Sequence, residues 1–209
     1  MNKNSEIIKR LLEHYPNPKT PLLHKNTWEL LIAVILSAQT TDVLVNKLTP
    51  TLFNRYSSPA ALAQADLGEV EKLIKGVNYF KTKAKNIIKT SKIIVDQYEG
   101  EVPDSMDALV TLAGVGRKTA NVIISEAFNK PVGVVVDTHV KRLSNRLGFT
   151  KEQTPEKIEQ DLMNQFPKEH WRELSLALIY HGRKTCFARK PDCKNCFLND
   201  ICPSAFKCD

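Results

Sequence analysis

The chain has 209 residues, of which 42% are hydrophobic, enough to bury one good core or two small lobes. Lys and Arg number 30 against 23 Asp and Glu, and this net charge of +7 favours a polyanionic partner over an acidic small molecule. No apolar run is long enough to span a bilayer, and the N-terminal MNKNSEIIKR lacks the apolar core of a signal peptide. We therefore exclude membrane and exported proteins and expect a cytoplasmic protein, or a nuclear one if the source is eukaryotic.

The first part of the chain has the periodicity of helices. Apolar residues at helical spacing predict a helix over Ser5 to His14, which three prolines then end. Asn26, with Glu29 three residues later, has the pattern of a capping box and predicts a helix that runs to Ala38. Because this helix is apolar nearly all round, we expect it to be central and buried. A polar cluster follows it: Ser37, Gln39, Thr40, Thr41 and Asp42.

The middle of the chain continues this pattern. Ser58 before Pro59, and Asp66 three residues before Glu69, are N-cap signals that start two more helices. An apolar stripe beyond them predicts a longer helix. We expect its other face to be a solvated row of lysines, namely Lys81, Lys85, Lys89 and Lys92.

The stretch Thr111 to Val122, TLAGVGRKTANV, contains a Gly-Val-Gly turn between two predicted helices. We expect Asp104 to open the first helix and the second to run to about Phe128. Gly114 and Gly116 tolerate positive φ and leave the backbone bare, so an anion could approach the amides that open the second helix. A tight connection without a ligand is the commoner meaning of such a turn, and its spacing alone leaves both interpretations open.

The segment after Pro131 is β-branched from Val132 to Val136, and we expect a buried extended connection there, because no partner strand is visible. It leads to Asp137 and to a helix predicted over Thr138 to Leu147. Further helices are predicted from Thr154-Pro155 onward and over Glu169 to Thr185. The pattern as a whole predicts an all-α fold.

Four of the five cysteines form a closely spaced group, C-x6-C-x2-C-x5-C, made of Cys186, Cys193, Cys196 and Cys202. A disulfide framework fits poorly, because nothing marks a secreted chain. Closely spaced thiolates suit structural zinc or an iron-sulfur cluster, and the spacing by itself favours neither. Cys208 lies outside the group, and we expect it to be a spare thiol.

Four motifs together resemble the endonuclease III family of helix-hairpin-helix DNA glycosylases of base excision repair. They are LLIAVILSAQTTD, LAGVGRKTANV, the VDTHV of Val136 to Val140, and the cysteine group, and they cover nearly the whole chain. The resemblance implies a two-lobed, all-α fold. Residues 22–131 would form a six-helix domain with the helix-hairpin-helix at about 107–128, and residues 1–21 and 132–209 a helical cluster domain.

The resemblance also implies a cofactor and a partner. It favours a 4Fe-4S cluster over zinc, held by the four grouped cysteines. The implied partner is double-stranded DNA with damaged pyrimidines or abasic sites, bound by a monomer that is cytoplasmic and nucleoid-associated.

Two catalytic residues follow from the same resemblance. Lys118 matches the family's lysine, whose neutral amine attacks the sugar C1′ of a nucleotide rotated out of the duplex and forms a Schiff base before β-elimination. Asp137 matches the catalytic aspartate, which stabilises the cationic sugar and assists deprotonation of the amine. Without the resemblance, Lys118 would be interpreted as a solvated surface charge and Asp137 as a helix N-cap.

The resemblance places DNA contacts at eight further positions. Gln39 matches a glutamine that fills the gap, and Tyr79 occupies the place of a wedge often held by leucine, with an ordinary core aromatic as the alternative. The other positions are Gly114, Gly116, His139, Arg142, Arg189 and Lys190. His139 could instead be a packed histidine. Asp192 stands where a basic residue is common, which predicts a weaker grip on the DNA backbone.

Three functions fit these motifs. The first is a bifunctional glycosylase and abasic-site lyase acting on oxidised pyrimidines. The second is a monofunctional mismatch glycosylase, against which Lys118 argues, since that class usually lacks this lysine. The third is a non-catalytic DNA-binding module, in which Lys118 and Asp137 would be only a surface charge and a cap.

Overall fold

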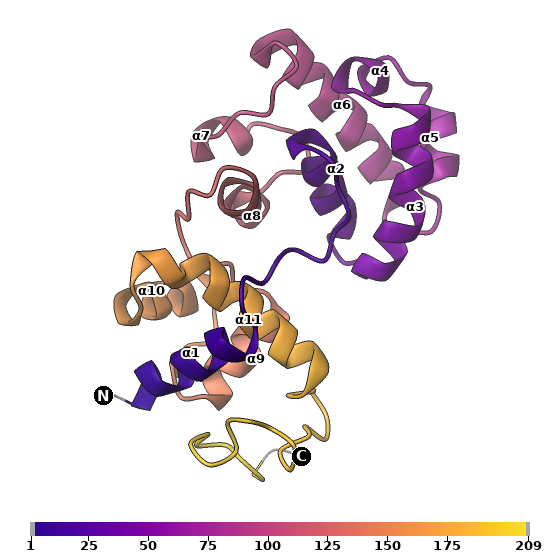
Figure 1. Cartoon of the computed structure of the whole chain (residues 1–209). Coiled ribbons are helices and arrows are strands. Elements are labelled where there is room, and N and C mark those ends of the chain that lie inside the picture. The colour runs from indigo at the N-terminus through magenta and orange to yellow at the C-terminus, as the bar shows by residue number, and fades with distance from the viewer. Residues whose placement is uncertain (1–2, 208–209) are drawn as a thin grey trace. The chain divides into compact units, whose positions relative to one another are not determined.

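The computed structural model describes residues 3–207, and the chain divides into two compact units (Figure 1). Unit 1 comprises Met1–Lys19 and Pro131–Asp209, and unit 2 comprises Thr20–Lys130. Every regular element within the described residues is a helix, which confirms the predicted all-α fold. None of these helices is long and apolar enough to cross a membrane.

Unit 2 contains helices α2 to α8. Their bounds are α2 Thr27–Ser37, α3 Asp42–Arg55, α4 Pro59–Ala63, α5 Leu67–Leu73, α6 Phe80–Tyr98, α7 Met106–Leu109 and α8 Arg117–Ala127. Helix α2 packs against α3, α6 and α8. All residues from Trp28 to Leu36 are buried, so the predicted central helix is confirmed.

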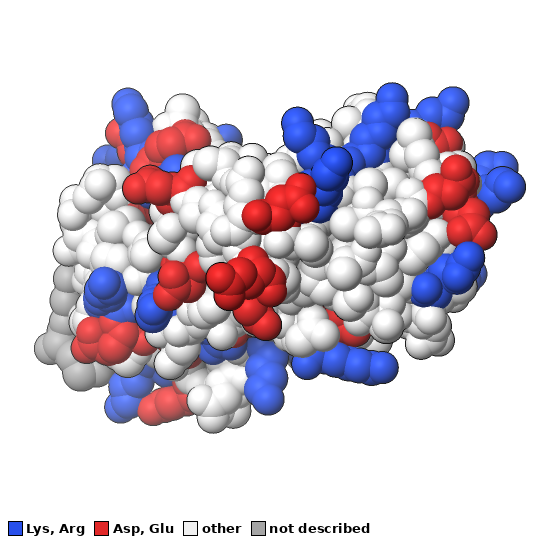
Figure 2. All heavy atoms as spheres, turned by 90° about the horizontal axis from the view of Figure 1, so that it is seen from above, with Lys and Arg blue, Asp and Glu red and all other residues white. Residues whose placement is uncertain are grey.

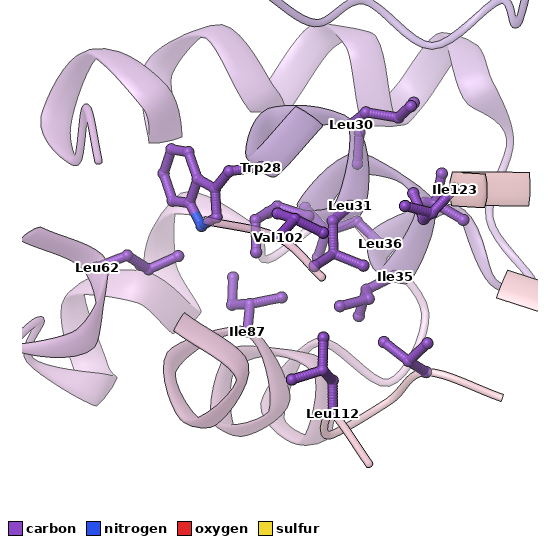
Figure 3. Packing of buried hydrophobic residues seen from close by; sticks show 14 of the residues in the cluster. Trp28, Leu30, Leu31, Ile35, Leu36, Leu62, Ile87, Val102, Leu112 and Ile123 are labelled. Atoms are coloured by element: carbon purple, nitrogen blue, oxygen red, sulfur yellow. The ribbon is translucent and has the colours of Figure 1, made fainter. Parts of the chain in front are cut away.

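The core of unit 2 forms around α2. Figure 3 shows side chains from several helices gathered there, among them Leu31 of α2, Ile87 of α6 and Ile123 of α8. Each fully buried leucine or isoleucine contributes about 1.5–3 kcal/mol relative to an exposed one, so this apolar helix accounts for much of the unit's stability. The indole of Trp28 donates a hydrogen bond to Ser91 Oγ at 3.2 Å, which satisfies its buried polar group.

Most predicted helix starts of unit 2 are confirmed. The side chains of Asn26, Ser58 and Asp66 each accept a hydrogen bond from the amide three residues later. The prediction for Asp104 is wrong, because Ser105 is the N-cap of α7 and Asp104 instead pairs with Lys130 at 2.7 Å. The sequence pattern also missed α3, which begins inside the polar cluster after α2, with Thr41 as its N-cap.

Unit 1 is built from both ends of the chain. Its elements are α1 Lys3–His14, α9 Thr138–Arg146, α10 Pro155–Gln165, the 3₁₀ helix Lys168–His170 and α11 Trp171–Lys184. Helix α11 packs against α1 and α9, and α10 packs against α9. The predicted last helix is therefore confirmed in position, but its first turn is 3₁₀ and the α-helix begins at Trp171.

The extended segment before α9 carries buried valines into the core of unit 1. Val134 and Val136 are 1% and 7% exposed, and no strand forms between Val132 and Val136, as predicted. The amide of Val135 donates to Ser175 Oγ of α11 at 3.0 Å. This anchored segment fixes where α9 begins and therefore where Asp137 lies within the unit.

Candidate functional site

In the turn between α7 and α8, the first glycine packs tightly against α6. Gly114 has a φ of 80°, and a Cβ added there would lie 2.9 Å from Asn86 Nδ2. Thr90 Oγ1 donates to the carbonyl oxygen of Ala113 at 2.9 Å, so α6 supports the turn from one side. Gly114 is therefore required by the fold, both for its positive φ and for its close approach to α6.

The second glycine of the turn is open. Gly116 is the N-cap of α8, and a Cβ added there would meet nothing within 4 Å. Because glycine has no side chain, the first amides of α8 receive no side-chain cap. Arg117 and Lys118 follow directly and both are exposed. A bare helix N-terminus with two adjacent cations is suited to binding an anion.

Asp137 is the N-cap of α9, as the sequence suggested. Its Oδ1 accepts hydrogen bonds from the amides of His139 and Val140, both at 2.8 Å. Its Oδ2 accepts no hydrogen bond from the described part of the chain. The side chain is half-buried, so one carboxylate oxygen is fixed by the helix while the other remains free to act on a ligand.

His139 and Arg142 lie on α9 against α11. Arg142 Nη2 donates to the carbonyl oxygens of Gly182 and Cys186, at 2.9 and 3.0 Å, and lies 3.2 Å from His139 Nδ1. Because a guanidinium only donates, Nδ1 accepts and the proton of a neutral His139 is on Nε2. Burial lowers the pKa of His139, which keeps that ring neutral. The helices meet this closely because residue 182 is glycine.

Gln39 and Tyr79 lie on two turns of unit 2 that hydrogen-bond to each other. Both residues are exposed, and Tyr79 is 68% exposed, so it is not a core aromatic. Asn78 Nδ2 donates to the carbonyl oxygen of Gln39, and the amide of Asn78 donates to Thr40 Oγ1 at 3.2 Å. The structure therefore brings together the two residues that the sequence predicted as gap filler and wedge.

The four grouped cysteines line one cavity in unit 1. None of Cys186, Cys193, Cys196 and Cys202 forms a disulfide, and the cavity is also lined by other residues, among them His181 and Leu198. Within residues 3–207, no three His, Cys, Asp or Glu side chains are grouped so that they could hold a single metal ion. Cysteine sulfurs are the soft ligands that zinc and iron-sulfur clusters prefer. Cys208 lies outside the described residues.

Sequence comparison decides which family these features belong to. Residues 32–168 match the family "HhH-GPD superfamily base excision DNA repair protein". The chain is 50% identical over 201 residues to an endonuclease III of Synechocystis sp., covering 96% of this chain and 92% of that protein. The chain belongs to the endonuclease III family. It is accordingly a DNA repair enzyme of the base excision pathway.

Solved structures agree with this membership. The chain is similar to the protein in "Structure of a non-covalent Endonuclease III-DNA Complex", with a TM-score of 0.91, 41% identity, and coverage of 99% of this chain and 98% of that one. The same values hold for "Structure of a Trapped Endonuclease III-DNA Covalent Intermediate: Estranged-Adenine Complex". In the second structure, that relative is trapped as a covalent intermediate with DNA.

Two contacts to cysteine sulfurs in this endonuclease III family member were missed by sequence reasoning. Arg146 Nη1 donates to Cys186 Sγ at 3.3 Å, while the same guanidinium donates to the carbonyl oxygens of Phe187 and Ala188. His181 Nε2 lies 3.5 Å from Cys196 Sγ. Because these partners are far apart in the sequence, no local spacing could have indicated them.

Buried His181 also contacts α1. Its Nδ1 lies 3.3 Å from the hydroxyl of Tyr15, so the ring joins Tyr15 to the sulfur of Cys196. Burial lowers the pKa of His181 to about 4, which keeps the ring neutral at physiological pH. A neutral ring that accepts from Tyr15 at Nδ1 carries its proton on Nε2 and can donate it to a thiolate.

The loop between the first two cysteines presents the predicted basic residues. Arg189 and Lys190 are exposed, and Lys190 has a φ of 51°. The amide of Asp192 donates to the carbonyl oxygen of Thr185 at 2.9 Å, and its carboxylate accepts from Asn195. Asp192 thus stabilises the turn from which the basic side chains extend.

On the face drawn in Figure 2, positive charge does not form one continuous patch. Figure 2 shows Lys and Arg side chains interspersed with Asp and Glu over the face drawn, although the whole chain carries a net charge of +7. Lys118 is one of the exposed cations, and it lies beside the uncapped N-terminus of α8.

Proposed function

We propose that this chain is a bifunctional DNA N-glycosylase and abasic-site lyase that removes oxidised pyrimidines from duplex DNA. One observation carries the proposal: the exposed amine of Lys118 follows directly on the open, uncapped N-terminus of α8. An anion-binding helix end can hold a DNA phosphate while the adjacent amine acts on a sugar. The covalent intermediate trapped between DNA and a relative of 41% identity supports the same chemistry here.

In the proposed reaction, Lys118 is the nucleophile. The lone pair of its neutral amine forms a bond to C1′ of the extruded nucleotide while the bond from C1′ to the base breaks. The base leaves with that electron pair and takes up a proton, and opening of the sugar gives the Schiff base. Loss of a proton from C2′ then breaks the bond between C3′ and its oxygen, so the strand is nicked on the 3′ side.

Asp137 provides the fixed negative charge in this proposal. As the base departs, positive charge develops on the sugar, and a carboxylate already oriented by two amides stabilises it without reorganising. Oδ2 is the atom that we assign to that stabilising role. The N-cap and the catalytic role are therefore compatible, because they use different oxygens.

The remaining predicted residues hold DNA in this proposal. The amides after Gly114 and Gly116 bind a phosphate, and Arg189 and Lys190 contact the backbone as exposed cations. In this proposal, Nε2 of the neutral His139 donates a hydrogen bond to the DNA backbone. Arg142 supports the adjacent backbone of α11, and its DNA contact remains a prediction, because the guanidinium already donates to two carbonyls of unit 1.

Gln39 and Tyr79 enter the space that the extruded nucleotide leaves. The amide of Gln39 can offer both a donor and an acceptor to the orphaned base, and Tyr79 can stack or wedge beside it. Both side chains are exposed on connected turns, which supports this assignment over a structural one.

We infer that Cys186, Cys193, Cys196 and Cys202 hold a 4Fe-4S cluster. The cavity that the four thiols line and the donors to two of their sulfurs support this. When bound, the cluster supplies four iron–sulfur bonds that cross-link residues 186–202 and so stabilise the basic loop. Cys193→Ser should lose iron and visible absorbance together, and a variant that retains both would contradict the ligand set.

We also infer that the enzyme acts in the cytoplasm, at the nucleoid, where its DNA substrate lies. The function itself is tested by incubating the protein with an end-labelled duplex that carries one thymine glycol. A bifunctional enzyme cuts the strand without further treatment. A monofunctional glycosylase releases the base but cuts only after hot alkali, and a binding module does neither.

A further inference from the structure

Gln39 and Tyr79 share an unusual backbone conformation. Their φ angles are 54° and 57°, in the left-handed region that side chains with a Cβ rarely adopt. Such a conformation persists only where the surrounding structure imposes it, and it is often found where a side chain must be presented in one direction. Both residues are exposed, so packing of their own side chains does not impose it.

Asn78 links the two turns through both its side chain and its backbone. Its Nδ2 donates to the carbonyl oxygen of Gln39, and its amide donates to Thr40 Oγ1. These bonds cross 39 and 38 residues of sequence. Because Asn78 directly precedes Tyr79, the position of one turn fixes the position of the other.

Lys83 lies beneath the same turns. It is 6% exposed, and its ammonium donates to the carbonyl oxygens of Leu36 and Ala38 and to Thr40 Oγ1. The two carbonyls belong to the C-terminal end of α2, where unpaired carbonyls and the helix dipole favour a cation. Lys83 therefore uses all three donors to hold the turn that carries Gln39, and Thr40 Oγ1 is shared with Asn78.

We propose that Asn78 and Lys83 are positioning residues that hold Gln39 and Tyr79 as one preformed pair for insertion into DNA. A pair that is ordered before binding loses less conformational entropy when it enters the duplex than two independent turns would. The bonds of Asn78 and Lys83 are made to main-chain carbonyls and to Thr40, so they leave the side chains of Gln39 and Tyr79 available. This inference rests on the proposed function of those two side chains.

The test removes the donor of Asn78 without changing its shape. Asn78→Asp replaces the side-chain amide that donates to Gln39 with a carboxylate that cannot donate. Asn54→Asp, at an exposed position on α3, is the matched control for the added charge. Thr40→Val removes the oxygen shared by Asn78 and Lys83 and is the second variant. Melting temperatures are measured for all proteins, so that loss of folding is separated from loss of positioning.

Insertion is read by 2-aminopurine fluorescence, with the probe base placed opposite an abasic-site analogue in a duplex. Losing one hydrogen bond from a preformed turn should slow insertion and duplex excision roughly 3- to 10-fold in Asn78→Asp. The same variant should match wild type in borohydride trapping on a single-stranded abasic oligonucleotide, which offers no gap to fill. Asn54→Asp should match wild type in both assays.

The outcomes separate this inference from the proposed function. Wild-type insertion kinetics in both Asn78→Asp and Thr40→Val would overturn the positioning role while leaving Lys118 chemistry intact. If Asn78→Asp slowed excision on the duplex and reduced trapping on the single strand by the same factor, the positioning role would also be overturned, because positioning acts only on the duplex. If wild type forms no adduct on any abasic DNA, the proposed lyase fails, and the fluorescence signal still decides whether Asn78 positions the pair.

Discussion

Oδ1 of Asp137 accepts a hydrogen bond from the backbone amide of Val140 at 2.8 Å, while Oδ2 accepts none from the described residues. One oxygen of this carboxylate thus caps helix α9, and the other is left to contact a ligand. This division predicts that the structural and catalytic contributions of Asp137 can be separated by substitution.

Asp137→Asn should keep the N-cap, because asparagine caps helices about as well as aspartate, so the free energy of unfolding should change by less than about 1 kcal/mol. Base excision should slow roughly 100-fold or more, since the fixed charge is lost. Asp137→Ala should lose both the N-cap and the charge, so excision should slow and the free energy of unfolding should fall by about 1 kcal/mol. Single-turnover excision and thermal melting measure the two effects, and an Asn variant with the wild-type rate would refute the catalytic role.

Gly116→Ala tests the anion site at the start of α8. The new Cβ meets no atom within 4 Å, so stability should fall by about 1 kcal/mol or less. A phosphate held by the first amides would be displaced, and the dissociation constant for abasic-analogue DNA should rise roughly 10- to 100-fold. Gly114→Ala is the contrast: it should destabilise the protein, because it combines a positive φ with a close approach to Asn86. Unchanged DNA affinity in Gly116→Ala would rule out phosphate binding at this turn.

Arg146→Lys tests whether the guanidinium supports the cysteine cavity. Lysine keeps the charge but not the planar fork that reaches Cys186 Sγ and the carbonyls of Phe187 and Ala188. We expect the lost hydrogen bonds to lower the local stability by about 1–3 kcal/mol. The visible iron-sulfur absorbance should therefore decay several-fold faster in air. Lys194→Met, an exposed change between two of the cysteines, is the control. If both variants decay at the wild-type rate, Arg146 does not support the cluster.

His139 predicts a specific dependence of stability on pH. Burial lowers its pKa from the ordinary value of 6.5 and outweighs the attraction of Asp137. Between the ordinary and the lowered pKa the unfolded chain binds more protons than the folded one, so the free energy of unfolding falls as the pH drops below about 6.5. Above that pH the effect is absent.

His139→Asn keeps an acceptor for Arg142 but does not titrate. The difference in melting temperature between wild type and His139→Asn should therefore shift in favour of the variant as the pH falls from 7.5 to 5.5. His181 titrates in both proteins, so its contribution cancels. A difference that stays constant with pH would show that the folded-state pKa of His139 is not lowered.

Much of the fold could be predicted because its signals are local. The N-caps at Asn26, Ser58 and Asp66, and the apolar run of α2, depend on residues a few positions apart. Asp104 failed as a cap because Lys130, 26 residues away, pairs with it and Ser105 is equally suited to the cap. The 3₁₀ turn before Trp171 has no distinct sequence signal.

Motifs predict the candidate site residues, whereas they give no sign of the residues that hold those side chains in place. The sequence gives no sign of the contacts of Lys83, because its three acceptors lie more than 40 residues away. The contacts of Arg146 with Cys186 and of His181 with Tyr15 likewise cross from one helix to another segment. Such contacts depend on tertiary packing, which a single sequence does not display.

The central claim is that the amine of Lys118 forms a covalent bond to DNA. The most direct measurement is borohydride trapping on duplex DNA that carries one abasic site, with wild type, Lys118→Ala and Lys85→Ala side by side, the last removing an exposed lysine of α6 as control. We expect a reduced, covalent adduct with wild type and Lys85→Ala and none with Lys118→Ala. An adduct of equal yield with Lys118→Ala, or no adduct with wild type, would contradict the claim.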